Sequence, residues 1–221
     1  MMAAAPPPVA AATPVTVQPQ GLQGLLRAAP APVGLVVFAH GSGSGRLSPR
    51  NNHVAEGLGR AGLASLLVDL LTPEEELDRA NVFDIPLLAA RLAGAAAWAR
   101  HIPALAGLPI GYFGASTGAG AALLAASAED ADITAIVSRG GRPDLAGSRA
   151  LAHVRAPTLL IVGSHDLPVL KLNRVAMRHM HARTELAIVP GAGHLFEEPG
   201  TLDRVIDHAA RWFVRHMQED G

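Results

Sequence analysis

Short runs of apolar residues recur along the chain, separated by longer segments whose apolar residues have a helical spacing. Six of these runs are predicted strands, and they cover residues 34–39, 65–70, 110–114, 133–138, 158–162 and 185–189. They are apolar almost throughout, which is typical of strands buried on both faces. Two further runs, 15–18 and 22–27, flank the turn-like sequence PQG and predict a hairpin at the edge of a sheet.

Helices are predicted between the strands. Ser48 followed by Pro49 is a helix cap with proline at the first helical position, and Gly62 is expected to end that helix. Asp84 is expected to begin a second helix, because the apolar residues of Ile85 to Ile102 step by three and four.

A last helix is predicted after Thr201, where apolar residues again fall on one face. Strands that alternate with helices indicate a mostly parallel sheet with helices on both sides. The predicted fold class is therefore α/β, a doubly wound sheet of about eight strands. We expect one domain over residues 15–221.

The chain begins with MMAAAPPPVAAATP, which is apolar but has no positively charged start and is interrupted by prolines. This composition is typical of a disordered leader, assigned to residues 1–14, and not of a signal peptide. No apolar run reaches the roughly 18 uninterrupted residues of a membrane helix. We therefore expect a cytoplasmic protein that does not contact a membrane.

Charge and cysteine content exclude several functions. The chain has 18 basic and 19 acidic side chains, a formal net charge of -1, whereas a nucleic-acid partner would require a clustered basic excess. There are no cysteines, which excludes disulfides, thiol catalysis and cysteine-ligated metal. We expect neither a metal nor a cofactor, and the sequence leaves self-association into a homo-oligomer open.

Ser116 is the candidate nucleophile. It lies in GASTG, a G-x-S-x-G pattern, where a predicted strand ends and a helix should begin. Small residues are needed on both sides, because the sharp turn that exposes such a serine leaves no room for a Cβ. The alternative is a structural Gly/Ser turn, but the surrounding strand and helix favour catalysis.

A serine hydroxyl needs a base, and His194 is the candidate. It follows the last predicted strand in PGAGH, so its loop returns to the carboxyl end of the sheet. His179 and His181, two residues apart, would not share one helix face, so a metal site is not expected there. Five histidines are predicted within helices, as surface or packing residues: His53, His179, His181, His208 and His216.

Asp166 is the candidate acid that orients the histidine. It follows the predicted strand TLLIV, and the order Ser116, Asp166, His194 is the order of the α/β-hydrolase triad. Asp166 could also cap the next helix, a role compatible with the catalytic one. Asp69 and Asp144 are the alternative acids, although Asp69 lies before the serine and within a strand-like run.

The glycine-rich loop HGSGSG follows the first predicted parallel strand and is a candidate oxyanion loop. Two backbone N–H groups must converge on the developing negative charge. One is expected from Thr117, directly after the nucleophile, and the other from Ser42 or Gly41. The phosphate-binding patterns G-x-x-x-x-G-K-[ST] and G-x-G-x-x-G are absent, which argues against nucleotide binding.

Three residues near these loops are candidates for contact with substrate. Arg46 follows the oxyanion loop and Arg139 follows the strand at 133–138, so both are expected at the edge of the sheet where ligands bind. Either arginine could pair with a substrate carboxylate. The alternative is that they bind loop carbonyls or neighbouring carboxylates such as Asp144. His40, at the start of the glycine-rich loop, is the third candidate.

Five motifs together resemble the dienelactone hydrolase-related branch of the α/β-hydrolase superfamily: HGSGSGRLSPRN, GYFGASTGAG, VSRGGRPDL, APTLLIVGSHD and GAGHLFEEPG. The resemblance runs from about Gly34 to the C-terminus and implies an eight-stranded hydrolase without a cap domain. Dienelactone hydrolases carry a cysteine nucleophile where this chain has Ser116, which favours a general carboxylesterase. Similar sequences also occur fused to phosphoribosyltransferase-like domains, and we expect no such domain within these residues.

The expected function is therefore hydrolysis of small carboxylic esters or lactones through an acyl-enzyme on Ser116. Few residues separate the strands at 133–138 and 158–162, so little apolar wall is expected around the site, and short acyl chains should be preferred. Two alternatives stay open. One is an acyltransferase or peptidase that uses the same three residues, and the other is a non-catalytic interaction module on a hydrolase scaffold.

Overall fold

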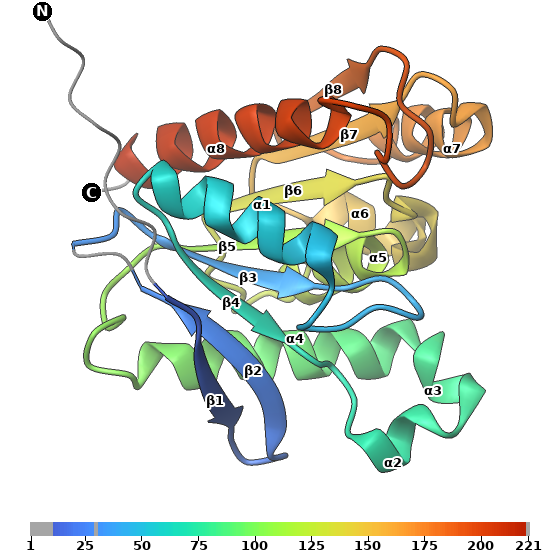
Figure 1. The fold of residues 1–221 in the computed structure, drawn as a ribbon. Helices are drawn as coiled ribbons and strands as arrows, with labels where there is room; N and C mark the ends of the chain where they lie inside the picture. Colours follow the sequence, from blue (N-terminus) through green and yellow to red (C-terminus); the bar gives the residue numbers. More distant parts are fainter. Residues whose placement is uncertain (1–10, 29–30, 220–221) are drawn as a thin grey trace, which may run out of the picture.

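The computed structural model describes residues 11–28 and 31–219. Eight strands form one sheet in the order β1-β2-β4-β3-β5-β6-β7-β8 (Figure 1). The strands are β1 (Thr13–Val17), β2 (Leu22–Arg27), β3 (Leu35–Ala39), β4 (Ala64–Val68), β5 (Ile110–Ala115), β6 (Ala135–Arg139), β7 (Thr158–Gly163) and β8 (Thr184–Val189). The β1–β2 hairpin is antiparallel to β4, and all pairs from β4 to β8 are parallel. The predicted sheet is confirmed.

Helices cover both faces of the sheet (Figure 1). They are α1 (Pro49–Arg60), α2 (Pro73–Glu76), α3 (Arg79–Val82), α4 (Ile85–Arg100), α5 (Thr117–Ala126), the 3-10 helix η1 (Pro143–Ala146), α6 (Gly147–His153), α7 (Leu167–Met177) and α8 (Thr201–Glu219). α1 and α8 pack on one face, and α4 and α5 on the other. Successive residues of a strand point to opposite faces, so a strand such as β3 must be apolar throughout.

The predicted ends of α1 are confirmed in detail. The Ser48 hydroxyl accepts a hydrogen bond from the Asn51 N–H, and Pro49 occupies the first turn. After the helix, Gly62 adopts φ +84, a left-handed conformation that only glycine reaches without strain. These local signals place α1 so that its N-terminus lies directly after the glycine-rich loop.

Several boundaries differ by a few residues from the predictions; Arg139, for example, is the last residue of β6 and does not follow it. Thr13 and Pro14, assigned to the leader, belong to β1, because they pair with Leu26 and Leu25 of β2; the predicted leader over 1–10 lies outside the described residues. His179 and His181 do not lie in a helix. Turn-like hydrogen bonds from Arg178 and His179 end α7, and the chain then enters β8.

The connections after the parallel strands differ in length. The β6–β7 connection holds only η1 and α6, and within residues 11–28 and 31–219 no cap domain covers the sheet, as predicted. The β4–α4 connection is longer and folds into α2 and α3, which project beyond the sheet (Figure 1). No helix in the described part of the chain is long and apolar enough to cross a membrane.

Candidate active site

Ser116 lies on the sharp turn between β5 and α5. Its backbone has φ 49 and ψ -120, a conformation strained for a residue with a Cβ. A Cβ at Gly118 would lie 2.1 Å from the Ala39 carbonyl oxygen, and one at Gly114 would lie 2.5 Å from the Ala119 Cα. The two glycines of GASTG are therefore required for the close approach of α5 to the strands.

His194 and Asp166 come together at the same edge of the sheet. The His194 Nδ1 lies 2.6 Å from the Asp166 Oδ2, although the two residues lie in different loops. Asp166 occupies the N-cap position of α7, but its side chain makes no capping hydrogen bond. An Nδ1–H that donates to the carboxylate leaves the His194 Nε2 free to accept a proton.

The two alternative acids are engaged elsewhere. Asp144 forms a bidentate pair with Arg142, at 2.9 and 2.7 Å, and this hydrogen bonding raises the pKa of Arg142. Asp69 accepts a hydrogen bond from the Arg46 N–H at 2.6 Å and also pairs with its guanidinium. Neither carboxylate is bonded to His194.

Glycines bring the other loops close to the candidate triad. A Cβ at Gly41 would lie 3.0 Å from the Ser116 Cβ, and one at Gly140 would lie 3.1 Å from the His194 carbonyl oxygen. Gly140 has φ +52 and follows Arg139, whose carbonyl accepts the Ser116 N–H. No hydrogen bond joins the Ser116 hydroxyl to His194 in the described structure; such catalytic contacts often tighten only when substrate binds.

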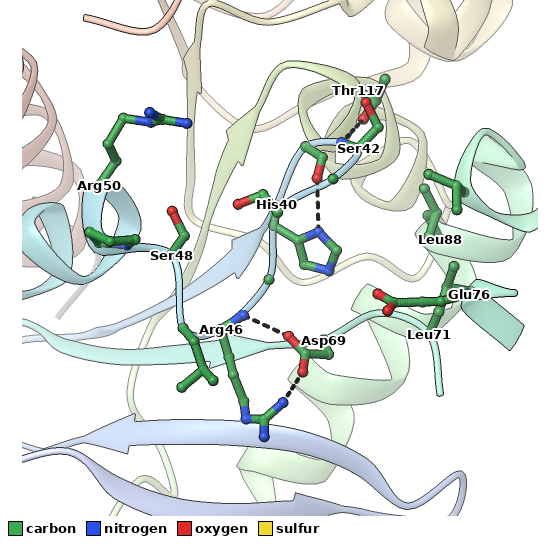
Figure 2. Close-up of a pocket in the computed structure, with 17 residues that line it drawn as sticks. His40, Ser42, Arg46, Ser48, Arg50, Asp69, Leu71, Glu76, Leu88 and Thr117 are labelled. Carbon is green, nitrogen blue, oxygen red and sulfur yellow. Dashed lines mark hydrogen bonds and ion pairs between the residues drawn. The ribbon is translucent and has the colours of Figure 1, made fainter. Parts of the chain in front are cut away.

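The glycine-rich loop offers one of the two expected N–H donors. The Ser42 N–H donates to the Thr117 Oγ1 at 3.0 Å (Figure 2), which favours Gly41 over Ser42 among the two predicted donors. The N–H groups of Gly41 and Thr117 have no partner among the described residues. The Thr117 side chain thus holds the loop in place, and the backbone N–H groups of Gly41 and Thr117 remain available to bind an oxyanion.

His40 is a buried part of the loop structure. Its Nδ1 lies 3.1 Å from the Gly41 carbonyl, and its Nε2 lies 3.2 Å from the Leu70 N–H (Figure 2). A carbonyl needs a donor and an N–H needs an acceptor, so these contacts require the neutral Nδ1–H tautomer. Both ring nitrogens contact the backbone, but His40 also lines the cavity described below, and its contact with substrate stays a prediction.

A cavity of about 630 Å³ lies beside Gly41, Ser42 and Thr117. One wall is apolar: it includes Leu71, which follows β4, and Leu88 of α4 (Figure 2). Val82 of α3 also lines the cavity. The expectation of little apolar wall is wrong in this respect, because it considered only the β6–β7 connection. The long segment between β4 and α4 was the signal in the sequence that could have indicated this wall.

The two candidate arginines differ in position. Arg46 lines the cavity but is paired with Asp69. Arg139 does not line it: it is buried at the end of β6, with its guanidinium 5.9 Å from the centre of the Phe113 ring. Burial, and secondarily the charge of Arg50, lowers the pKa of Arg139 to about 10. The structure thus does not bring Arg46 and Arg139 together into one carboxylate site.

The described residues contain no cluster of three or more histidine, aspartate or glutamate side chains that could hold a metal ion.

No protein-family model matches the chain. Two Mycobacterium tuberculosis proteins, provisionally named phosphoribosyl transferases, are 56% identical over 207 residues; the match covers 94% of this chain and 46% of theirs. The chain thus spans about half the length of these curated relatives. Among structures of lower identity, Est1E from Butyrivibrio proteoclasticus is 16% identical, with a TM-score of 0.77 over 94% of this chain and 99% of Est1E, and shows the same fold.

The crystal structure of a dienelactone hydrolase from Anabaena variabilis matches over nearly the whole length of both proteins. It is 52% identical, covers 96% of this chain and 99% of its own, and superposes with a TM-score of 0.88. The match therefore includes the whole sheet and the connections between its strands. The chain belongs to the dienelactone hydrolase-related branch of the α/β-hydrolases.

Proposed function

We propose that the protein is a serine hydrolase that cleaves small carboxylic esters or lactones through an acyl-enzyme on Ser116. The observation that carries this proposal is the hydrogen bond between His194 and Asp166 at the edge of the sheet where Ser116 occupies its strained turn. The dienelactone hydrolase from Anabaena variabilis, which is 52% identical, supports the same reaction class.

In the proposed reaction, the His194 Nε2 takes the proton of the Ser116 hydroxyl as the Oγ attacks the ester carbonyl. The N–H groups of Gly41 and Thr117 donate to the oxyanion of the tetrahedral intermediate. His194 then gives its proton to the departing alcohol, which leaves the acyl group on the Ser116 Oγ. A water molecule attacks this ester by the same steps in reverse order, which releases the acid and restores the serine.

The side-chain environment fits these roles. The Asp166 side chain is 10% exposed and His194 is 40% exposed, so the carboxylate is sheltered while the imidazole reaches solvent and substrate. A sheltered carboxylate stabilises the imidazolium that forms during attack, because charges interact more strongly away from water. A serine nucleophile, in place of the cysteine of dienelactone hydrolases, favours ordinary esters as substrates.

Phosphoribosyl transfer, the activity in the name of the mycobacterial relatives, is not proposed for this chain. The chain spans 46% of those proteins, whereas it matches a dienelactone hydrolase over 99% of that enzyme's length.

Acyl transfer to an alcohol would use the same acyl-enzyme intermediate as hydrolysis. Addition of an alcohol acceptor to the ester assay, with the ester product measured, distinguishes transfer from hydrolysis.

Fluorophosphonate labelling followed by peptide mapping tests the nucleophile. We expect the adduct on Ser116, and we expect Ser116→Ala to lose both the label and nearly all hydrolysis of para-nitrophenyl butyrate while it keeps the wild-type melting temperature. Ser148→Ala, in α6 away from the site, serves as the control and should retain both. An adduct on another serine, or full activity of a folded Ser116→Ala variant, would overturn the proposal.

A further inference from the structure

We propose that the cavity beside Thr117 binds the acyl part of the substrate, and that Glu76 makes it prefer neutral or cationic acyl groups over anionic ones. This inference rests on the proposed function, since it states on which side of Ser116 the acyl group of the attacked ester lies. It concerns the cavity formed by the glycine-rich loop, the end of β4 and the segment α2–α4.

The order of strands in the sheet indicates on which side of Ser116 the acyl group lies. β4 and β3 lie on one side of β5, which carries Ser116, whereas β6, β7 and β8 lie on the other. The cavity is lined from the β4 and β3 side, while Asp166 and His194 follow β7 and β8. In the proposed reaction His194 must reach the oxygen of the leaving alcohol, so the alcohol lies on the β6–β8 side. The acyl group then extends to the opposite side, past Gly41 and Thr117, into the cavity.

The charges that line the cavity are mostly paired. Asp69 holds Arg46 through both its N–H and its guanidinium. Arg50 donates to the Glu197 carboxylate at 2.8 Å, outside the cavity lining. Both ring nitrogens of His40 contact backbone groups. Among the described lining residues, Glu76 is the one charged side chain with no ion pair or hydrogen bond.

The three consecutive glutamates of α2 have different surroundings. The Glu75 carboxylate accepts the Thr72 N–H in a capping box and pairs with Arg91. Glu74 is fully exposed and does not line the cavity. Glu76 is the member of the run that lines it, and Figure 2 shows its carboxylate turned toward the cavity, on the side opposite Arg50.

An unpaired carboxylate at the cavity repels an anionic acyl group and attracts a cationic one. Because Glu76 is exposed to solvent, the interaction is screened, and we expect an effect of about three- to tenfold in kcat/KM that weakens as salt is added. Arg46 does not reverse this preference, since its charge is already neutralised by Asp69. The cavity is thus unsuited to a substrate whose acyl part carries a carboxylate.

The test compares three para-nitrophenyl esters of similar length: the neutral pentanoate, the anionic glutarate monoester and the cationic gamma-trimethylammonio butyrate. For the wild-type protein we expect the glutarate ester to have the lowest kcat/KM. Glu76→Gln should raise kcat/KM for the glutarate ester about three- to tenfold relative to pentanoate. The same substitution should lower kcat/KM for the cationic ester by a similar factor. Glu74→Gln, on the same helix, is the matched control and should leave both ratios unchanged.

A glutarate ester hydrolysed as well as pentanoate by the wild type, or ratios that Glu76→Gln does not change, would overturn the role of Glu76. A second series carries the charge on the leaving alcohol; if Glu76→Gln changes that preference instead, the assigned side is wrong. Failure of the proposed function has a different signature, because pentanoate would then not be hydrolysed, or would be hydrolysed equally by Ser116→Ala.

Discussion

The aspartates near the site have different roles, and the neighbouring side chain decides which role each carboxylate takes. Asp166 stands where a helix cap is expected, yet its carboxylate bonds to His194 and not to the N–H groups of α7. Asp69 and Asp144 are also carboxylates near the carboxyl ends of strands, but each has an arginine as its partner. Within this set, only the Asp166 carboxylate is available to orient an imidazole.

We predict that Asp166→Asn lowers kcat/KM for para-nitrophenyl butyrate by about two to four orders of magnitude. An amide in place of the carboxylate neither stabilises the imidazolium nor fixes the Nδ1–H tautomer that leaves Nε2 free. Asp144→Asn is the comparison, because it breaks only the pair with Arg142, and it should keep nearly full activity. Equal losses of kcat/KM in the two variants would contradict the assignment of Asp166 as the acid. A loss only in Asp144→Asn would assign that role to Asp144.

At the scale of elements, the site depends on how closely α5 approaches the strands. The helix begins at Thr117 directly after β5, and its first turn lies against the end of β3. Gly118 makes this approach possible, since a Cβ there would overlap the carbonyl oxygens of Ala39 and His40. A displaced α5 would move the Ser116 hydroxyl and the Thr117 N–H together.

Gly118→Ala is predicted to lower the free energy of unfolding by about 1–3 kcal/mol, because the added methyl group must push α5 away from β3. Gly94→Ala provides the contrast: a Cβ at Gly94, within α4, meets nothing within 4 Å, so that variant should gain about 0.5–1 kcal/mol from helix propensity. Urea unfolding measures both. An unchanged free energy of unfolding in Gly118→Ala would mean that the close approach of α5 to β3 does not contribute to stability.

At the scale of the whole molecule, the cavity combines segments that are distant in the sequence. The glycine-rich loop follows β3, the Arg46 partner Asp69 follows β4, and the apolar wall includes Val82 of α3 and Leu88 of α4. The described residues form no cap domain, and the long β4–α4 connection supplies the apolar wall of the cavity. If the cavity binds the acyl group as proposed, selectivity depends on packing across these segments.

We predict that butyrate esters have a higher kcat/KM than acetate esters, by up to roughly tenfold, because burial of each added CH₂ contributes about 0.8 kcal/mol. Palmitate esters should be poorer than both, since nothing encloses a long chain beyond the cavity. Val82→Ala should reduce the butyrate-to-acetate ratio. Leu77→Ala is the control, because Leu77 is 85% exposed and does not line the cavity. A preference for acyl chains of twelve carbons or more would contradict this prediction.

The sequence by itself determined the strands, their order along the chain and the helices with clear caps or apolar spacing, but not the short helices α2, α3, η1 and α6. Apolar runs, helix caps and turn glycines are local signals, so the eight strands, the ends of α1 and the turn at Ser116 could be predicted from neighbouring residues. The candidate acid and base were also predictable, because parallel strands bring the residues that follow them to one edge of the sheet.

Only the tertiary structure decided the partners. It showed that Asp69 holds Arg46, that Thr117 occupies the Ser42 N–H, and that both nitrogens of His40 bind backbone. It also placed the segment between β4 and α4 beside the glycine-rich loop, where it forms a cavity wall. The physical reason is that hydrogen bonds and cavity walls depend on angstrom-scale distances between residues far apart in sequence, which no local pattern encodes.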